Sequence, residues 1–211
     1  MRQFLLRFPR QDGPEGLEKR RLMKEYDATA PAYDMRYREE QELKIGFILS
    51  RVRPRGGVVL DAGCGTGMLL EKIVQSSFAI GIDTSIKMLE EAKGKGFPDL
   101  ILADLEALPL VDGCCKTVYS ISVLQLLGDP AKAIGELMRV LEPGGEFAIS
   151  LLGKAKFARG LQISGAVYRE DQSESLKDTF YTGHKETAEG QGRRHITTTF
   201  YNKLNHRRSG V

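Results

Sequence analysis

Residues 58–67 read VVLDAGCGTG, and this stretch decides the fold. An apolar run is followed by an acid, Asp61, and then by glycines at every second position. A glycine-rich turn between a strand and a helix lets a ligand lie against backbone N–H groups, and the helix N-terminus adds positive partial charge. The pattern therefore predicts a strand, a ligand-binding turn and a helix that begins near Thr66.

The spacing of Gly63, Gly65 and Gly67 separates this turn from two nucleotide-binding motifs. A dinucleotide turn reads G-x-G-x-x-G and would place its third glycine where this chain has Met68. The chain also has no G-x-x-x-x-G-K-[ST] phosphate loop. Asp61, just before the turn, would repel a pyrophosphate at low dielectric, whereas it suits a cationic ligand group.

The segment from Val58 to Leu152 alternates short apolar runs with amphipathic helices. Strands are expected at 58–62, 78–83, 100–104, 117–124 and 146–152. These runs are continuously apolar, as is typical of strands that are covered on both faces. Strands that alternate with helices predict a parallel sheet with right-handed crossovers and a ligand crevice at the carboxyl ends of the strands. Two further helices are expected around 14–27 and 35–53, the second burying Leu43, Phe47, Ile48 and Val52.

Two more acids follow strands at this crevice. Asp83 ends the second expected strand, where a carboxylate can accept hydrogen bonds from both ribose hydroxyls. Asp104 ends the third, where a carboxylate beside Leu105 could accept from an adenine amino group. A ligand with a cationic head, a ribose and an adenine, and without a phosphate, is S-adenosylmethionine. Asp83 alone would also suit NAD, so a nicotinamide-dependent oxidoreductase is an alternative. Asp61 and Met68 argue against it.

Size and composition indicate one α/β domain with an ordinary core. The chain has 211 residues, of which 41% are hydrophobic and 28% charged. No apolar run approaches the roughly 20 residues that span a bilayer, and the N-terminus does not read as a signal peptide. Three cysteines provide no disulfide framework, and no Cys/His set has metal-ligand spacing. A cytoplasmic protein without a metal is therefore expected.

The charge is small but unevenly distributed. The net charge is +3, with a basic excess in residues 1–55 and 151–211 and an acidic excess between them. The basic ends either form a solvated surface or meet an anionic partner such as RNA. We divide the chain into N-terminal helices that cover the cofactor site (1–55), the cofactor-binding α/β core (56–152) and a basic, weakly structured C-terminal segment (153–211). Within the last segment, 194–201 could form a strand.

Several motifs arrive in the order of a known family. The D-x-G-x-G-x-G turn, the strand and helix GIDTSIKML (81–89) and the turn RVLEPGG (139–145) together resemble the class I S-adenosylmethionine-dependent methyltransferases, specifically the methyltransferase type 11 or UbiE-like group. The resemblance covers roughly residues 56–152, and YDATAPAYDMRY (26–37) resembles the segment before the core. It implies a Rossmann-like sandwich with a mostly parallel sheet.

The resemblance also implies a set of cofactor-binding residues. Asp61, Gly63, Cys64 and Gly65 would line the methionine end, and Ser120 and Ser122 would border it. Asp83 would bind the ribose, Thr84 and Met88 would flank the adenosine, and Asp104 and Leu105 would meet the adenine. Tyr33, together with Tyr26 and Arg36, would close over the cofactor, although these tyrosines could equally pack the N-terminal helices on the core.

The chain departs from the family pattern in two places. Gln125-Leu126 stands where many relatives have histidine, which removes an obvious acid/base candidate. The stretch HITTTFYNK (195–203) resembles the lead into a last helix and two final strands, yet only LNHRRSGV follows. A sheet that lacks its last two strands is therefore expected, with the fifth strand at its edge.

The expected reaction is in-line transfer of the sulfonium methyl group, which leaves S-adenosylhomocysteine. No catalytic residue is assigned, because a general base is needed only for a protonated acceptor. A small-molecule acceptor is favoured over an RNA wobble base, and a monomer or homodimer is expected. A cofactor-binding protein without transferase activity is the other alternative, and the short C-terminus favours it.

Overall fold

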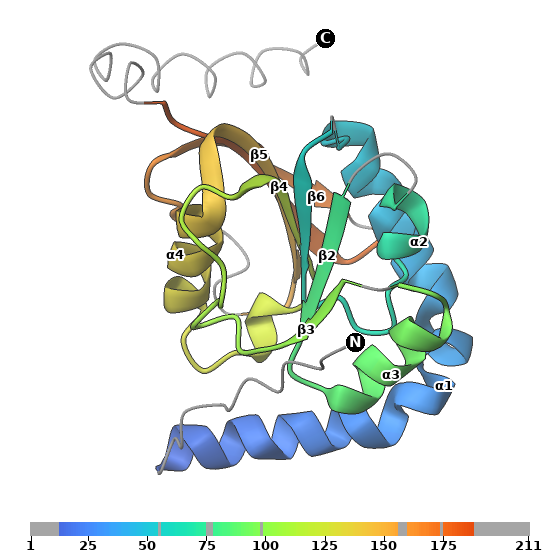
Figure 1. Ribbon diagram of the computed structural model, residues 1–211. Helices are drawn as coiled ribbons and strands as arrows, with labels where there is room; N and C mark the ends of the chain where they lie inside the picture. Colours follow the sequence, from blue (N-terminus) through green and yellow to red (C-terminus); the bar gives the residue numbers. More distant parts are fainter. Residues whose placement is uncertain are drawn as a thin grey trace, which may run out of the picture.

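The computed structural model describes residues 13–54, 56–74, 78–97, 99–155, 160–173 and 175–187. In these ranges the chain forms one mixed sheet with helices on both faces (Figure 1). The strands are β1 (Val58–Ala62), β2 (Phe78–Asp83), β3 (Leu100–Leu102), β4 (Cys115–Ile121), β5 (Leu141–Leu152), β6 (Ala166–Ser173) and β7 (Asp178–Lys185). The helices are α1 (Pro14–Arg51), α2 (Leu70–Ile73), α3 (Ile86–Gly94), the short 3-10 helix η1 (Leu124–Leu126) and α4 (Pro130–Val140).

The sheet has seven strands in the order β3-β2-β1-β4-β5-β7-β6. Strands β1 to β5 pair in parallel, which confirms the expected parallel α/β core. β7 runs antiparallel to both β5 and β6. The order reverses between β1 and β4, and in such open sheets ligands bind outside the carboxyl ends of the strands at that point.

The expectation that the last two strands are missing is wrong. β6 and β7 form an antiparallel pair within residues 166–185, and β7 covers the edge of β5 from Glu146 to Leu152. Exposed and half-buried residues alternate along β6, because it is the edge strand of the sheet. This polar alternation, unlike the apolar runs of β1 to β5, explains why the segment looked weakly structured in the sequence. The strand suggested at 194–201 lies outside the described residues.

The N-terminal region forms one helix of 38 residues rather than two. Pro31 lies inside α1, and the helix bends near its middle (Figure 1) because proline removes a backbone hydrogen bond and crowds the preceding turn. The first half runs beneath the carboxyl ends of the strands, and the second half lies along one face of the sheet. On that second half Ile48 is buried as expected, but Leu43 is exposed and its neighbour Lys44 is buried.

Two apolar cores lie on the two faces of the sheet. Successive residues of a strand point to opposite faces, so Val59 joins the core under α1, α2 and α3, whereas Leu60 joins the core under α4.

Residues 117–124 and 146–152 were expected as strands, and β4 and β5 both begin earlier than expected. Most of the expected turn RVLEPGG (139–145) lies within β5, beside a register shift in the pairing of β5 with β4.

Candidate active site

The glycine turn follows β1 directly and has the backbone geometry that glycine permits. Gly63, Gly65 and Gly67 have φ values of 81°, 53° and 83°. The N–H groups of Gly63 and Cys64 both donate to the carbonyl of Ile82, at 2.8 and 2.9 Å. A Cβ at Gly63 would lie 2.3 Å from Val123, whereas a Cβ at Gly65 would meet no atom within 4 Å. The turn therefore packs on one side and leaves Gly65 open for a ligand. The helix that follows was expected to begin near Thr66, but it begins at Leu70.

Asp61 is the next-to-last residue of β1 and is buried, with 3% of its surface exposed. Its Oδ2 is buried and has no hydrogen-bond partner among the described residues. Burial, with a smaller contribution from the charge of Asp83, raises the pKa of Asp61 to about 8. A buried carboxyl without a partner costs free energy, and a bound cation would satisfy it.

Asp83 ends β2 and is held by the backbone. Its Oδ1 accepts from the N–H of Ser85 and its Oδ2 from the N–H of Gly65, both at 2.8 Å. Burial raises the pKa of Asp83, and these backbone donors partly offset that rise. Each carboxylate oxygen can accept more than one hydrogen bond, so Asp83 is oriented for a ligand and retains the capacity to bind one.

A pocket joins the turn, the end of β1 and the second half of α1. Five of the residues named from the sequence line it: Tyr33, Asp61, Gly63, Cys64 and Gly65. Six others that the sequence analysis did not assign to the cofactor complete the lining: Gln41, Ile45, Thr66, Met68, Leu69 and Ile121. The i, i+4 spacing of Gln41 and Ile45 places them on one face of α1, but nothing in the sequence says that this face meets the turn.

Asp83 and the remaining candidates do not line the pocket. Leu105 and Met88 are buried apolar side chains, and Thr84 is half-buried. Asp104 forms an ion pair with Lys19 of α1 at 2.7 Å. The Oγ of Ser120 is buried without a hydrogen-bond partner among the described residues.

Ser122 follows β4 and contacts a polar cluster instead of the pocket. Its φ is 56°, an uncommon value for a residue with a side chain. Its N–H donates to Ser150 Oγ at 3.0 Å, and its Oγ accepts from Lys44 Nζ at 3.1 Å. The sequence analysis missed Lys44, because a lysine on an amphipathic helix ordinarily lies in solvent.

The tyrosines of α1 pack against one another. The ring centroids of Tyr26 and Tyr33 are 6.4 Å apart, and those of Tyr33 and Tyr37 are 4.9 Å apart. Burial, followed by nearby charges, raises the pKa of Tyr33, which therefore stays protonated at neutral pH. Arg36 stacks over Tyr37, with its Cζ 5.3 Å from the ring centroid, and does not line the pocket.

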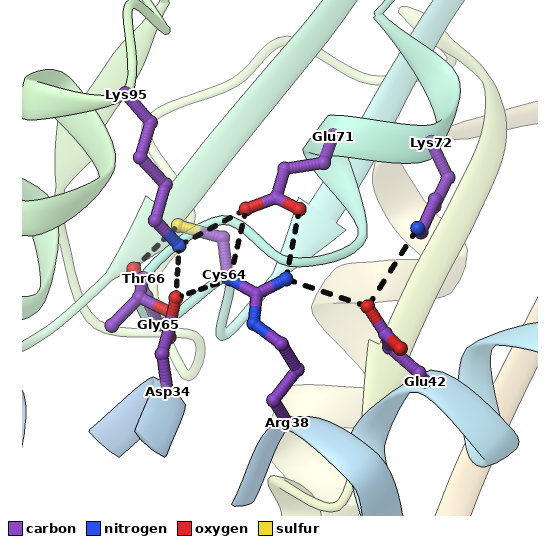
Figure 2. A network of polar contacts seen from close by, with 9 residues as sticks. All are labelled: Asp34, Arg38, Glu42, Cys64, Gly65, Thr66, Glu71, Lys72 and Lys95. Atoms are coloured by element: carbon purple, nitrogen blue, oxygen red, sulfur yellow. Dashed lines mark hydrogen bonds and ion pairs between the residues drawn. The ribbon is translucent and has the colours of Figure 1, made fainter. Parts of the chain in front are cut away.

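A network of charged side chains ties α1 to the glycine turn (Figure 2). Asp34 accepts a short hydrogen bond from Thr66 in the turn. It also forms an ion pair with Lys95 at 2.6 Å. Arg38 bridges Asp34 at 2.7 Å and Glu71 of α2 at 3.2 Å. Burial would raise the pKa of Asp34, but Lys95, Thr66 and Arg38 together lower it. The network therefore holds the second half of α1 against the wall of the pocket.

The fold and the site together define an α/β protein that can bind a nucleoside carrying a cationic group. Among the described residues, no group of three or more His, Cys, Asp or Glu side chains is arranged to hold a metal ion. The long helix α1 is too polar to cross a bilayer, and none of the other described helices qualifies either.

Comparison with known proteins specifies the family. Residues 60–149 match the methyltransferase domain of the type 11 methyltransferase family. The malonyl-[acyl-carrier protein] O-methyltransferase of Buchnera aphidicola is 30% identical over 168 residues, which cover 77% of this chain and 68% of that protein. The chain therefore belongs to the class I S-adenosylmethionine-dependent methyltransferases, whose methyl donor is S-adenosylmethionine.

Two further comparisons extend this result. The tRNA (carboxymethyluridine(34)-5-O)-methyltransferase of Arabidopsis thaliana is 36% identical over 138 residues, covering 64% of this chain and 33% of that protein. A solved structure of a Methanococcus maripaludis protein, assigned as an S-adenosylmethionine-dependent methyltransferase, superimposes with a TM-score of 0.62 at 15% identity. It covers 78% of this chain and 94% of that one, and at this identity it shows the shared fold alone. The chain spans 29% to 70% of the length of the first curated relatives that it matches.

Proposed function

We propose that the pocket binds S-adenosylmethionine with its ammonium group beside Asp61 and its ribose hydroxyls on Asp83. The observation that carries this proposal is the buried Oδ2 of Asp61, which lacks a partner among the described residues and borders the pocket. A cation there would satisfy a carboxyl that burial otherwise keeps protonated. Gly63, Cys64 and Gly65 would surround the methionine portion, and Tyr33 would cover it from α1.

The adenine end of the proposed site lies further along the carboxyl edge of the sheet. Asp104 and Leu105 would contact the adenine, and Thr84 and Met88 would flank the adenosine. The ammonium of Lys19 lies on Asp104 at 2.7 Å. Adenine at Asp104 would therefore either share this carboxylate with Lys19 or displace it.

For the acceptor, we propose a carboxylate oxygen of a small acyl group. By their names, the Buchnera relative acts on a malonyl group and the Arabidopsis relative on carboxymethyluridine, and both acceptors carry a carboxyl group. A carboxylate is ionised at neutral pH, so its oxygen can attack the methyl carbon without a general base. This chemistry agrees with Gln125-Leu126 at the position where many relatives have histidine. A cytoplasmic location is part of the same proposal.

An RNA acceptor is the second candidate. The first half of α1 carries a shallow groove lined by Arg20, Arg21 and Lys24, together with Leu17, Glu25 and Ala28. Basic side chains of this kind contact nucleic-acid phosphates. The relative from Arabidopsis supports the same candidate by its name.

The test begins with calorimetric titration of S-adenosylhomocysteine and NAD into the purified protein and its Asp83→Ala variant. We expect S-adenosylhomocysteine to bind with micromolar affinity and NAD not to bind. The Asp83→Ala variant should bind neither. Methyl-labelled S-adenosylmethionine is then supplied with malonyl-pantetheine or with an oligonucleotide containing carboxymethyluridine. A carboxyl methyl ester releases volatile label in alkali, so alkali-stable label on either acceptor would overturn the proposed carboxylate acceptor.

A further inference from the structure

Lys44 of α1 is a buried lysine that directly precedes Ile45, a residue of the pocket lining. Its side chain is 1% exposed, whereas lysine is almost never fully buried unless it is paired. Its Nζ lies 3.2 Å from Asp178 Oδ1, 2.7 Å from Glu40 Oε1 and 3.1 Å from Ser122 Oγ. One ammonium group therefore meets two carboxylates and a hydroxyl.

The two carboxylates differ in how firmly they are held. Asp178 at the start of β7 is fully enclosed, and its Oδ2 accepts from Ser122 Oγ at 3.3 Å. Glu40 lies one turn before Lys44 on the same helix, and 52% of its side chain is exposed. Solvent therefore screens the Glu40 side of this i, i+4 pair. Asp178 is thus the enclosed partner of Lys44, and Glu40 is the exposed partner on the solvent side.

The Lys44–Glu40 pair alternates along α1 with two residues that line the pocket. Gln41 and Ile45, which follow Glu40 and Lys44 in the chain, both line the pocket with Asp61. Ile121, which also lines it, directly precedes Ser122. The charge of Glu40 is among those that add to the effect of burial in raising the pKa of Tyr33, another lining residue.

We propose that Lys44 binds the carboxylate of the methyl acceptor and that Glu40 occupies this position until the acceptor arrives. The inference rests on the proposed function, because it assumes a carboxylate acceptor. One acceptor oxygen is bound by Lys44, and the other attacks the methyl carbon of the sulfonium. The new C–O bond forms as the C–S bond breaks, and the electron pair of that bond stays on sulfur to give neutral S-adenosylhomocysteine.

This step needs no proton transfer and makes its own product easy to release. The ester that forms carries no charge, so its attraction to the Lys44 ammonium falls. Glu40 then regains its ion pair. Asp178 keeps the ammonium oriented throughout, because its position at the start of β7 does not depend on the acceptor.

The decisive variant is Glu40→Gln, which removes the competing charge and leaves Lys44 in place. With malonyl-pantetheine as the acceptor, its KM is expected to fall about threefold at unchanged kcat. The matched control is Glu39→Gln, which changes an exposed glutamate one position earlier and should leave KM unchanged. S-adenosylhomocysteine affinity, measured by calorimetry, should be the same in all three proteins.

The complementary variant is Lys44→Met, which is expected to raise KM at least tenfold. Because this change leaves Asp178 buried without its cation, Lys44→Met/Asp178→Asn is made alongside it, and both are checked for S-adenosylhomocysteine binding. If the wild type methylates malonyl-pantetheine and Glu40→Gln has the same KM, Lys44 is only structural. That result would overturn this inference and leave the acceptor proposal standing. Wild-type protein that binds S-adenosylhomocysteine but methylates no carboxylate would overturn both the acceptor proposal and this role for Lys44.

Discussion

Lys19 and Asp104, which are 85 positions apart in the sequence, form an ion pair of 2.7 Å across the carboxyl edge of the sheet. Lys19 also lies 2.6 Å from Glu106 Oε2. These contacts fasten the first half of α1 over the place where we propose that adenine binds (Figure 1). In the proposed site the helix and the cofactor therefore contact the same carboxylate.

Lys19→Met is expected to increase the association rate of S-adenosylhomocysteine about fivefold, since a partly buried ion pair of about 1 kcal/mol no longer holds α1 closed. Stopped-flow fluorescence with a labelled cofactor analogue measures this rate. Lys24→Met changes an exposed lysine on the same helix and serves as the control. Equal rates in the two variants would mean that the Lys19 contact does not limit cofactor entry.

The raised pKa of Asp61 has a consequence for stability. Between pH 4 and the folded-state pKa of about 8, the folded cofactor-free protein holds a proton that the unfolded chain has released. The free energy of unfolding should therefore fall as pH rises through this window. Asp61→Asn should remove that slope, raise stability at pH 8 by on the order of a few kcal/mol and abolish cofactor binding. Urea unfolding at several pH values tests this, and parallel curves for the two proteins would contradict it.

Alanine at two glycines of the turn should have different effects. Gly63→Ala places a Cβ 2.3 Å from Val123 at a positive φ, so it should reduce stability by about 3 kcal/mol. Gly65→Ala has open space beside it and should cost about 1 kcal/mol, yet weaken S-adenosylmethionine binding at least tenfold. Thermal unfolding and calorimetry separate the two quantities. Normal affinity in a folded Gly65→Ala protein would mean that the cofactor does not approach this backbone.

The network of Figure 2 predicts a salt-dependent contribution from Arg38. Its side chain is 39% exposed, so solvent screens its contacts with Asp34 and Glu71. Arg38→Met should reduce the free energy of unfolding by about 1 kcal/mol in dilute buffer and by less in molar salt. Arg21→Met removes only an exposed pair within α1 and should change little. An effect of Arg38→Met that is independent of salt would indicate lost packing instead of lost charge.

The last two strands should be essential to the core. Phe180 of β7 is fully buried, and its ring centroid lies 4.3 Å from that of Phe47 on α1. Phe180→Ala should therefore destabilise the protein by about 3–5 kcal/mol. Val167→Ala on the edge strand β6, where the side chain is 53% exposed, should cost much less. Chemical unfolding of both variants decides the matter, and equal small losses would show that β7 is peripheral.

The sequence determined the parallel core and the cofactor turn because both depend on local patterns. Apolar runs specify buried strands, and the alternate glycines after Asp61 specify a turn with positive φ. The acids at the ends of β1 and β2 follow from the same pattern, because carboxyl ends of parallel strands share one edge. The family and its methyl donor follow from these elements.

Only the tertiary structure decided which residues from outside the core meet that edge. Lys19, Asp34 and Lys44 lie on one polar helix, and their spacing does not show that each faces a carboxylate or hydroxyl far along the chain. The two last strands were likewise hidden, since β6 is an edge strand and pairing, not apolar content, defines it. Contacts between distant segments depend on how the whole chain packs, and no short stretch of sequence encodes them.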